Sequence, residues 1–506
     1  MTTWRRLIAS LGLAALVMAG PRPINAAPKP PRGAMPETLV VHRPWPPLVS
    51  VRVFIGGGSS LDPPGKEGQT LLGWTSVLRG TKDRSRQQWQ AALDAIGAQV
   101  EVAVDKSGAM LVADAAADHV EALVRLLAEA LQSPRFDPEE VAAQREELLA
   151  DLQHLADDDG ALCDDALGRY LYRGQAVGRP AQGSVASLQA IAPTELAAWH
   201  ARQVTVSNLW VGFAGAIDAK RAHELVKAAF GGLPNRAAPR AVAVKGVTEG
   251  RRLLLVDKPR RGQTQMAVAL TTVAASAREF TALLVANAVL GGPFTSRVSR
   301  DVRQLRGWAY HAETTLAPGM HTSTWVATLG SATADAVPAL ELVVKLWEEL
   351  GRHGVTPAEL QFAKNWLLGA HKLSQETAAA ELAYQMRGRA LGMEPADIAA
   401  IPARIAAVDL KTVQRTLKER LRPEHLVAVV TGPARQLRDK LADSLCQFTV
   451  ETIAADGAPE TTTGAGRAVT SKPLAVEATP TTAPGEEPEE PDVDDVDDGA
   501  DLEPAP

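Results

Sequence analysis

The chain has 506 residues, of which 46% are hydrophobic and 22% charged, and these values exclude a wholly disordered, collagen-like or coiled-coil protein. The net charge of −6 is unevenly spread: residues 450–506 hold 15 acidic and 2 basic residues, so the remainder carries +7, which gives no case for nucleic-acid binding. Two cysteines, Cys163 and Cys446, are too few for a disulfide framework or a cysteine-based zinc site, and the sequence leaves their pairing open.

Residues 1–27 are typical of a secretory signal peptide. Arg5 and Arg6 precede a 13-residue apolar run at 7–19, and Ala26 and Ala27 provide small residues for cleavage. The run is too short to span a bilayer, which needs about 20 residues. We therefore expect an exported mature chain without a transmembrane segment, which is periplasmic if the source is a Gram-negative bacterium.

The first half of the body alternates strand and helix patterns. The expected elements, in chain order, are a strand at 48–55, helices at 69–78, 120–131 and 137–154, and a strand at 208–215 followed by a helix. The strand at 48–55 shows period-two alternation. Asp137 and Pro138 suit the cap and first turn of the helix that they open.

The second half repeats this plan. Its expected elements are a strand at 264–270, helices at 280–290, 337–350 and 356–371, and a strand at 424–432 followed by a helix. Matched landmarks lie 211, 219 and 217 residues apart, which indicates an internal duplication. We expect an α+β fold of two homologous halves, at 38–240 and 248–449, each an antiparallel-rich sheet with helices packed on one face.

Residues 68–81, with the glycines at 56–58 and the pattern at 84–97, resemble the pitrilysin/insulinase-type zinc peptidases, and the similarity runs from about residue 39 to 445. In that family an H-x-x-E-H motif on a helix supplies two zinc ligands and a catalytic base. The matching positions here are Leu71, Trp74 and Thr75, and the third ligand falls near Asp151. The resemblance therefore implies no metal in this chain, and the degenerate helix face is expected to lie in the core or an interface.

Other catalytic patterns are missing from the sequence. The ten histidines include no pair at helical spacing, so no second zinc helix is predicted, and His154 beside the acidic residues 157–159 fits a solvated loop. Neither a nucleophile elbow nor a phosphate-binding loop is present.

Residues 291–310 form the most specific pattern, because a Ser296-Arg297 pair precedes a helix that ends before Gly307. This stretch is similar to the second-half signature of the same family, in which an arginine and a tyrosine seven residues later reach the zinc site of a facing domain. Arg303 and Tyr310 have that spacing. The resemblance implies that both donate hydrogen bonds to the oxygen that gains charge during peptide hydrolysis.

Each of these residues also has a purely structural interpretation. Arg303 could pair with Asp301 or Glu313 on a helix surface, and Tyr310 could be a half-buried strand aromatic. For Arg297 the sequence leaves two roles open, namely substrate binding and a fixed intramolecular pair at a helix start. The surrounding signature favours a functional role for Arg303 and Tyr310.

Residues 450–506 are rich in threonine, proline and alanine and then strongly acidic, a composition typical of a disordered tail. For the whole chain, the resemblance implies the zinc-free subunit of a heterodimeric exported zinc metallopeptidase. A homologous H-x-x-E-H chain would hold the zinc, and each chain would form half of a clamshell over a peptide or unfolded polypeptide. The alternatives are a non-catalytic scaffold or peptide-binding protein of the same fold, and, more weakly, a homodimeric binding protein for unfolded exported peptides.

Overall fold

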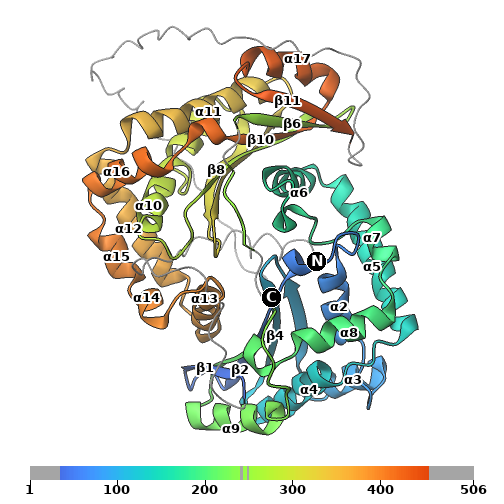
Figure 1. Ribbon diagram of the computed structural model, residues 1–506. Helices are drawn as coiled ribbons and strands as arrows, with labels where there is room; N and C mark the ends of the chain where they lie inside the picture. The colour runs from blue at the N-terminus through green and yellow to red at the C-terminus, as the bar shows by residue number, and fades with distance from the viewer. Residues whose placement is uncertain (1–34, 240–242, 248–249, 455–506) are drawn as a thin grey trace, which may run out of the picture. The chain divides into compact units, whose positions relative to one another are not determined.

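The computed structural model describes residues 35–239, 243–247 and 250–454 (Figure 1). The expected signal peptide at 1–27 and residues 455–506 of the expected acidic tail lie outside the described residues. No helix within the described ranges is both long and apolar enough to cross a membrane.

The first half is built around a five-stranded sheet of order β1-β5-β2-β4-β3. Its strands are β1 (Glu37–His42), β2 (Leu48–Gly56), β3 (Gln99–Val104), β4 (Gly108–Ala116) and β5 (Leu209–Gly215). Only the β1–β5 pair is parallel, and the other pairs are antiparallel. The expected strands at 48–55 and 208–215 correspond to the neighbouring strands β2 and β5.

Most helices of the first half cover one face of this sheet. They are α2 (Gln69–Val77), α3 (Arg86–Asp94), α4 (Val120–Gln132), α5 (Pro138–Asp157), α7 (Val185–Gln189), α8 (Pro193–Gln203) and α9 (Ala219–Phe230). Helix α6 (Asp159–Leu171) belongs to a different hydrophobic cluster. The side chain of Asp137 accepts a hydrogen bond from the Glu139 amide and caps α5, as the sequence predicts. Apolar side chains from β2, β4, β5, α2, α4 and α9 form the core of this half.

The second half repeats the strand order of the first. Its sheet runs β11-β6-β10-β7-β9-β8, and the strands are β6 (Arg252–Asp257), β7 (Gln263–Thr272), β8 (Ala309–Ala317), β9 (Ser323–Ala332), β10 (Val427–Gly432) and β11 (Thr449–Ala454). The order β6-β10-β7-β9-β8 matches β1-β5-β2-β4-β3, with β6 and β10 parallel as β1 and β5 are. The shared topology is what an internal duplication produces.

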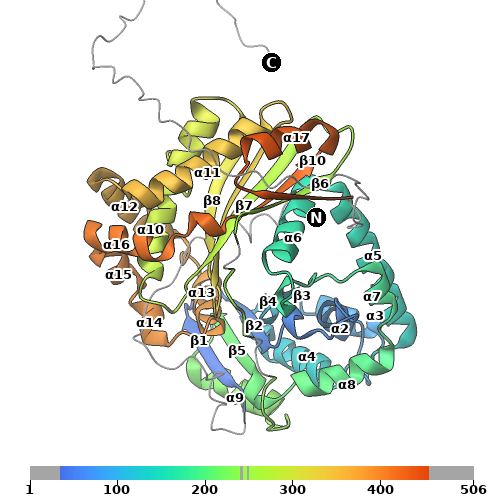
Figure 2. The same cartoon turned by 45° about the horizontal axis from the view of Figure 1, so that its top comes forward.

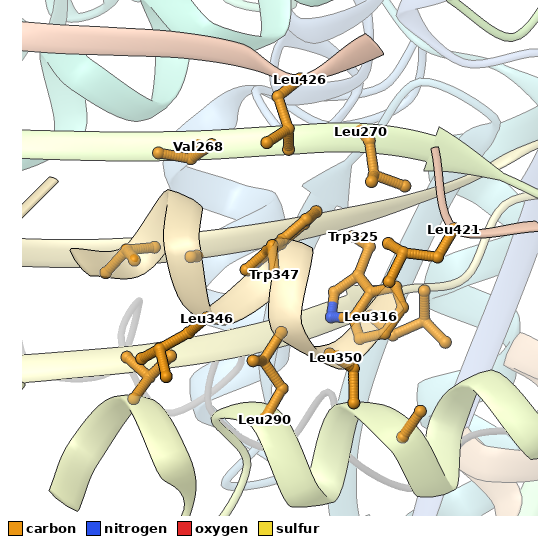
Figure 3. Packing of buried hydrophobic residues seen from close by; sticks show 14 of the residues in the cluster. Val268, Leu270, Leu290, Leu316, Trp325, Leu346, Trp347, Leu350, Leu421 and Leu426 are labelled. Carbon is orange, nitrogen blue, oxygen red and sulfur yellow. The ribbon is translucent and has the colours of Figure 1, made fainter. Parts of the chain in front are cut away.

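The core of the second half lies between its sheet and its own helices (Figure 3). These helices are α10 (Phe280–Leu290), α11 (Ala336–His353), α12 (Pro357–Leu373), α13 (Ala378–Ala390), α14 (Pro395–Ala399), α15 (Ile401–Ala407), α16 (Leu410–Arg420) and α17 (Ala434–Ser444). Trp325 of β9 and Trp347 of α11 are fully buried, with ring centroids 5.3 Å apart. The expected helix at 280–290 coincides with α10, all of whose residues are buried.

Two helices cross between the halves, which the sequence did not predict. Helix α6 of the first half packs on β7 and β10 of the second sheet, through Leu162, Ala166 and Leu167. Helix α13 of the second half packs on β1 and β5 of the first sheet, and lies beside β1 in both views (Figures 1 and 2). Each sheet therefore carries the helices of its own half on one face, as expected, and one helix from the other half on part of the opposite face.

Strand β11 corrects the expected boundary at residue 449. Residues 449–454 pair in parallel with β6 and form an edge of the second sheet. Val450 packs against the core of the second half, and Ile453 packs against the cluster that contains α6. β-Branched residues fill most of this segment, and such residues favour strands. The folded second half thus extends to Ala454.

Candidate functional site

Arg303 and Tyr310 lie together at the end of the second sheet. Arg303 belongs to a π-helix, η5 (Ser299–Gln304), and Tyr310 is the second residue of the edge strand β8. Between them Gly307 has φ = 66°, which allows the chain to turn from helix to strand. The guanidinium carbon of Arg303 lies 5.4 Å from the centroid of the Tyr310 ring.

The π-helix fixes the direction of this segment. The amide of Leu305 donates to the carbonyl of Arg300 at 2.9 Å, five residues back, and the Trp308 amide donates to Val302. Val298 and Val302 are fully buried and anchor the turn in the core. Short π-helical turns are uncommon and frequently occur at functional sites.

The guanidinium of Arg303 makes ring contacts only. The centroid of the Phe294 ring lies 4.5 Å from its central carbon, and the Tyr310 ring makes the second contact. No hydrogen bond or ion pair joins the Arg303 side chain to any described residue. Its five N–H groups are therefore available as donors at a half-buried position.

Asp301, two residues before Arg303, contacts other arginines. Asp301 forms an ion pair with Arg300 at 2.6 Å, and its carbonyl accepts from Arg306 at 2.8 Å. The structure thus lacks the surface pairing of Arg303 with Asp301 or Glu313 that the sequence left open. Tyr310 is 85% exposed, so it is not a half-buried strand aromatic either.

Arg297, in contrast, is bound within the chain. Its Nε and Nη2 donate to the two carboxylate oxygens of Glu359 at 2.7 Å each, and Nη2 also donates to the Gly354 carbonyl at 3.0 Å. Burial alone raises the pKa of the Glu359 carboxyl, but the hydrogen bonds from Arg297 and Thr356 outweigh this effect and hold it below its usual range. Two roles were left open for Arg297, and the structure shows one of them, the intramolecular pair.

The helix that resembles a zinc helix cannot hold a metal. Trp74 is 1% exposed, and its ring packs on Trp199 with centroids 5.2 Å apart. The Thr75 hydroxyl donates to the Leu71 carbonyl at 2.8 Å, and Leu71 offers no ligand atom. The donor set at these positions therefore does not fit zinc.

The expected position of the third zinc ligand lies on α5, which packs against α2. Asp151 is exposed on that helix. Beyond the end of α2, Arg79 also binds α5: its Nε donates to Gln144 at 2.7 Å, and it forms ion pairs with Glu140 and Glu147. Within the described ranges no three His, Cys, Asp or Glu side chains gather in a way that could hold a metal ion.

Phe294 is the residue of this site that the sequence analysis missed. It lies in the turn after α10, is 57% exposed, and has the shortest contact to the Arg303 guanidinium. The only available signal was an aromatic residue placed directly before the Thr295-Ser296-Arg297 sequence. An aromatic residue in a turn is ordinarily interpreted as a residue that packs against the core.

Two sequence profiles of one family match the chain side by side. Residues 38–184 match the profile described as "Insulinase (Peptidase family M16)", and residues 190–367 match "Peptidase M16 inactive domain". An uncharacterised zinc protease of Mycobacterium tuberculosis is 28% identical over 372 residues, covering 71% of this chain and 83% of the relative.

Solved structures have the same fold. A structure titled as the peptidase M16 inactive domain from Pseudomonas fluorescens superposes with a TM-score of 0.73 at 20% identity, over 79% of this chain and 96% of that one. A chain of complex III2 from Candida albicans gives a TM-score of 0.69 at 14% identity, over 81% and 97%. The chain belongs to the M16, or insulinase-type, peptidase family, as a member that lacks the zinc motif.

Proposed function

We propose that this chain is the zinc-free subunit of a two-chain zinc metallopeptidase that acts on peptides or unfolded polypeptides outside the cytoplasm. Arg303 and Tyr310 would donate hydrogen bonds to the scissile carbonyl oxygen, and a homologous H-x-x-E-H chain would hold the metal. The observation that carries the proposal is the Arg303 guanidinium, which has no hydrogen-bond acceptor among the described residues and lies beside the exposed Tyr310.

The chemistry of these two groups suits that role. In peptide hydrolysis the carbonyl oxygen gains negative charge as water attacks, and preorganised donors stabilise that charge. Zinc in the partner chain would polarise the carbonyl and lower the pKa of the attacking water. Arg303 offers a permanent positive charge with donors in one plane, and Tyr310 offers a hydroxyl donor from the adjacent strand.

The division between the two halves supports the same proposal. Leu71, Trp74 and Thr75 leave the first half without metal ligands, whereas the second half keeps an accessible donor pair. A chain of this kind needs a partner for chemistry, so the purified chain alone should bind peptide weakly and cleave none. Zinc-dependent cleavage by the isolated chain would contradict the proposal.

The experiment begins with a pull-down of the tagged mature chain from the envelope fraction of its own source. Zinc and peptidase activity are measured on the eluate, together with the identity of any second chain. A homologous H-x-x-E-H chain eluting near one to one, with zinc and activity, is the expected result. Elution alone and without activity would remove the assigned role of Arg303 and Tyr310.

Substitutions in the recovered complex then test the site itself. Losing one oxyanion donor typically lowers the rate about 10²–10³-fold, so Arg303→Ala should lower turnover at least tenfold with assembly intact. Arg306→Ala is the matched control, because this substitution removes the same charge from the same segment. Arg306 is exposed and contacts Trp308 instead of Tyr310. A similar loss in both variants would indicate a general charge effect rather than a specific donor.

A non-catalytic scaffold or peptide-binding protein remains the second candidate. The observation in its favour is the fold shared with a chain of complex III2 from Candida albicans. In that case Arg303→Ala leaves the turnover of any associated peptidase unchanged.

A further inference from the structure

Phe294 is held in a fixed place over the π-helix by its backbone. Its carbonyl accepts a hydrogen bond from the Gln304 side-chain amide at 3.0 Å, and Gln304 is the residue after Arg303. The Ser296 amide donates to the Pro293 carbonyl at 3.0 Å and closes the turn that carries Phe294. The backbone of Phe294 therefore has a defined position relative to the π-helix, and its ring contacts the Arg303 guanidinium from there.

The turn itself does not require an aromatic residue. Gly80, Ser85 and Arg86 of the first half match Gly291, Ser296 and Arg297 at a constant spacing of 211 residues. At that spacing the counterpart of Phe294 is Asp83, an exposed residue in a turn that folds without a ring. Phe294 is 57% exposed, so burial of its own surface gives little reason for an aromatic residue at this place.

The two ring contacts restrain Arg303 without using its donors. A guanidinium is planar, its N–H groups point outward in that plane, and aromatic rings attract its cationic carbon within about 6 Å. Phe294 at 4.5 Å and Tyr310 at 5.4 Å both lie within this range. Held by rings alone, the side chain loses rotational freedom while its N–H groups stay available for a ligand.

We propose that Phe294 is a positioning residue for Arg303, which it holds by the ring contact so that the guanidinium donors point at the peptide carbonyl. This inference deepens the proposed function and rests on it for its catalytic meaning. The contact between Phe294 and Arg303 can be tested on this chain alone, without the partner.

The first test measures the side chain of Arg303 directly in the intact chain. With ¹⁵N-arginine labelling, the Nε–Hε resonance of Arg303 is assigned by its loss in Arg303→Lys. Phe294→Leu should shift this resonance, because the ring current disappears, and Phe294→Tyr should keep it near its original position. Phe362→Leu, another exposed phenylalanine, on α12, is the control and should leave it unchanged. An unmoved Arg303 resonance in Phe294→Leu would overturn the proposal.

The second test uses the recovered complex. Phe294→Leu should lower kcat about tenfold with little change in KM, less than the ~10²–10³ of removing a donor, because Arg303 is misdirected rather than lost. Phe294→Tyr should restore kcat. Full turnover in Phe294→Leu, where Arg303→Ala loses it, would overturn the positioning role. If Arg303→Ala itself keeps full turnover, the proposed function fails, and the Arg303 resonance alone decides whether Phe294 positions it.

Discussion

Arg297 and Glu359 form a two-point ion pair, with both contacts at 2.7 Å, and Arg86 and Glu140 pair at 3.5 Å at the corresponding positions of the first half. Both arginines directly follow a serine and begin a helical segment after α2 or α10, and both glutamates lie in the first turn of the equivalent helices α12 and α5. The pair is thus a repeated element of the fold, which separates the role of Arg297 from that of Arg303 six residues later.

Arg297→Ala is therefore expected to weaken the fold rather than the reaction. The Arg297 side chain is 15% exposed, and its loss leaves the Glu359 carboxylate with the neutral donors of Thr356 only and removes the Arg297 donor from the Gly354 carbonyl. We expect the free energy of unfolding to fall by about 1–3 kcal/mol in urea titrations. Arg300→Ala, which breaks an exposed pair, should change it by less than about 1 kcal/mol. A loss of turnover in Arg297→Ala with unchanged stability would return Arg297 to the substrate site.

The same pair predicts a pH dependence at the acid end. The pKa of Glu359 in the folded chain lies below its ordinary value of about 4.3, so the folded state favours the carboxylate. Its contribution to stability is complete above that ordinary value and disappears as the pH falls through the folded pKa. The stability difference between wild type and Glu359→Gln should therefore shrink when urea titrations are repeated at progressively lower pH below about 4. A constant difference would mean that the charge on Glu359 contributes nothing.

His200 predicts a second pH effect, in a higher range. Burial lowers the pKa of His200 to about 4, against the hydrogen bond to Leu131, because the imidazole packs between Trp74 and Phe136. The unfolded chain takes up this proton near pH 6.5, so stability is lost as the pH falls from about 6.5 to about 4, by up to about 3 kcal/mol.

The measurement is the slope of unfolding free energy against pH in that window. His200→Phe should flatten the slope, because the replacement cannot take up a proton in either state. His223→Gln is the control, since His223 is exposed on α9. An equal slope in wild type and His200→Phe would exclude this histidine as its source.

The sequence predicted those parts of the fold that local patterns determine. Helix α10 coincides with the expected residues 280–290 because nine of its eleven residues are apolar, and Thr356 caps α12 by accepting from the Glu359 amide in the expected place. Strands β5 and β10 also end at the expected residues, Gly215 and Gly432. At the site, the sequence showed the seven-residue spacing of Arg303 and Tyr310, because a helix, Gly307 and a strand follow one another within this short segment.

The parts that the sequence missed depend on contacts between distant residues. Helices α6 and α13 both have buried residues, but α13 has no clear apolar stripe, and the sequence does not show which sheet covers either helix. Strand β11 is short, and pairing with β6 gives it a place in the sheet. The contact of Phe294 with Arg303 depends on the way a turn folds back over a π-helix, and π-helices have no clear sequence pattern.

Restoring the zinc motif in this chain should fail for a packing reason. The triple variant Leu71→His, Trp74→Glu, Thr75→His recreates H-x-x-E-H, but it replaces the fully buried Trp74 by a carboxylate beside Trp199. We expect a loss of about 3–5 kcal/mol in unfolding free energy, from the cavity and the unpaired buried charge, and no peptidase activity. The double variant that keeps Trp74 is the control and should lose much less, because Leu71 and Thr75 are half-buried. Tight zinc binding by a stable triple variant would contradict the packing argument.

The crossing helix α13 predicts that the first half cannot stand alone. Leu382 and Met386 are fully buried against the first sheet, and a Cβ on Gly212 would approach the Met386 sulfur to 2.7 Å, so the helix lies directly on β5. A fragment of residues 35–239 lacks this cover and exposes Leu39 and Trp210. It should bind a hydrophobic dye and aggregate during size exclusion, whereas co-expression with residues 243–454 should give a soluble complex. In the intact chain, Leu382→Ala should lower the free energy of unfolding by about 2–5 kcal/mol, although residue 382 belongs to the second half. A monomeric first half with cooperative unfolding would show that α13 is dispensable, and would make the two halves independent folding units.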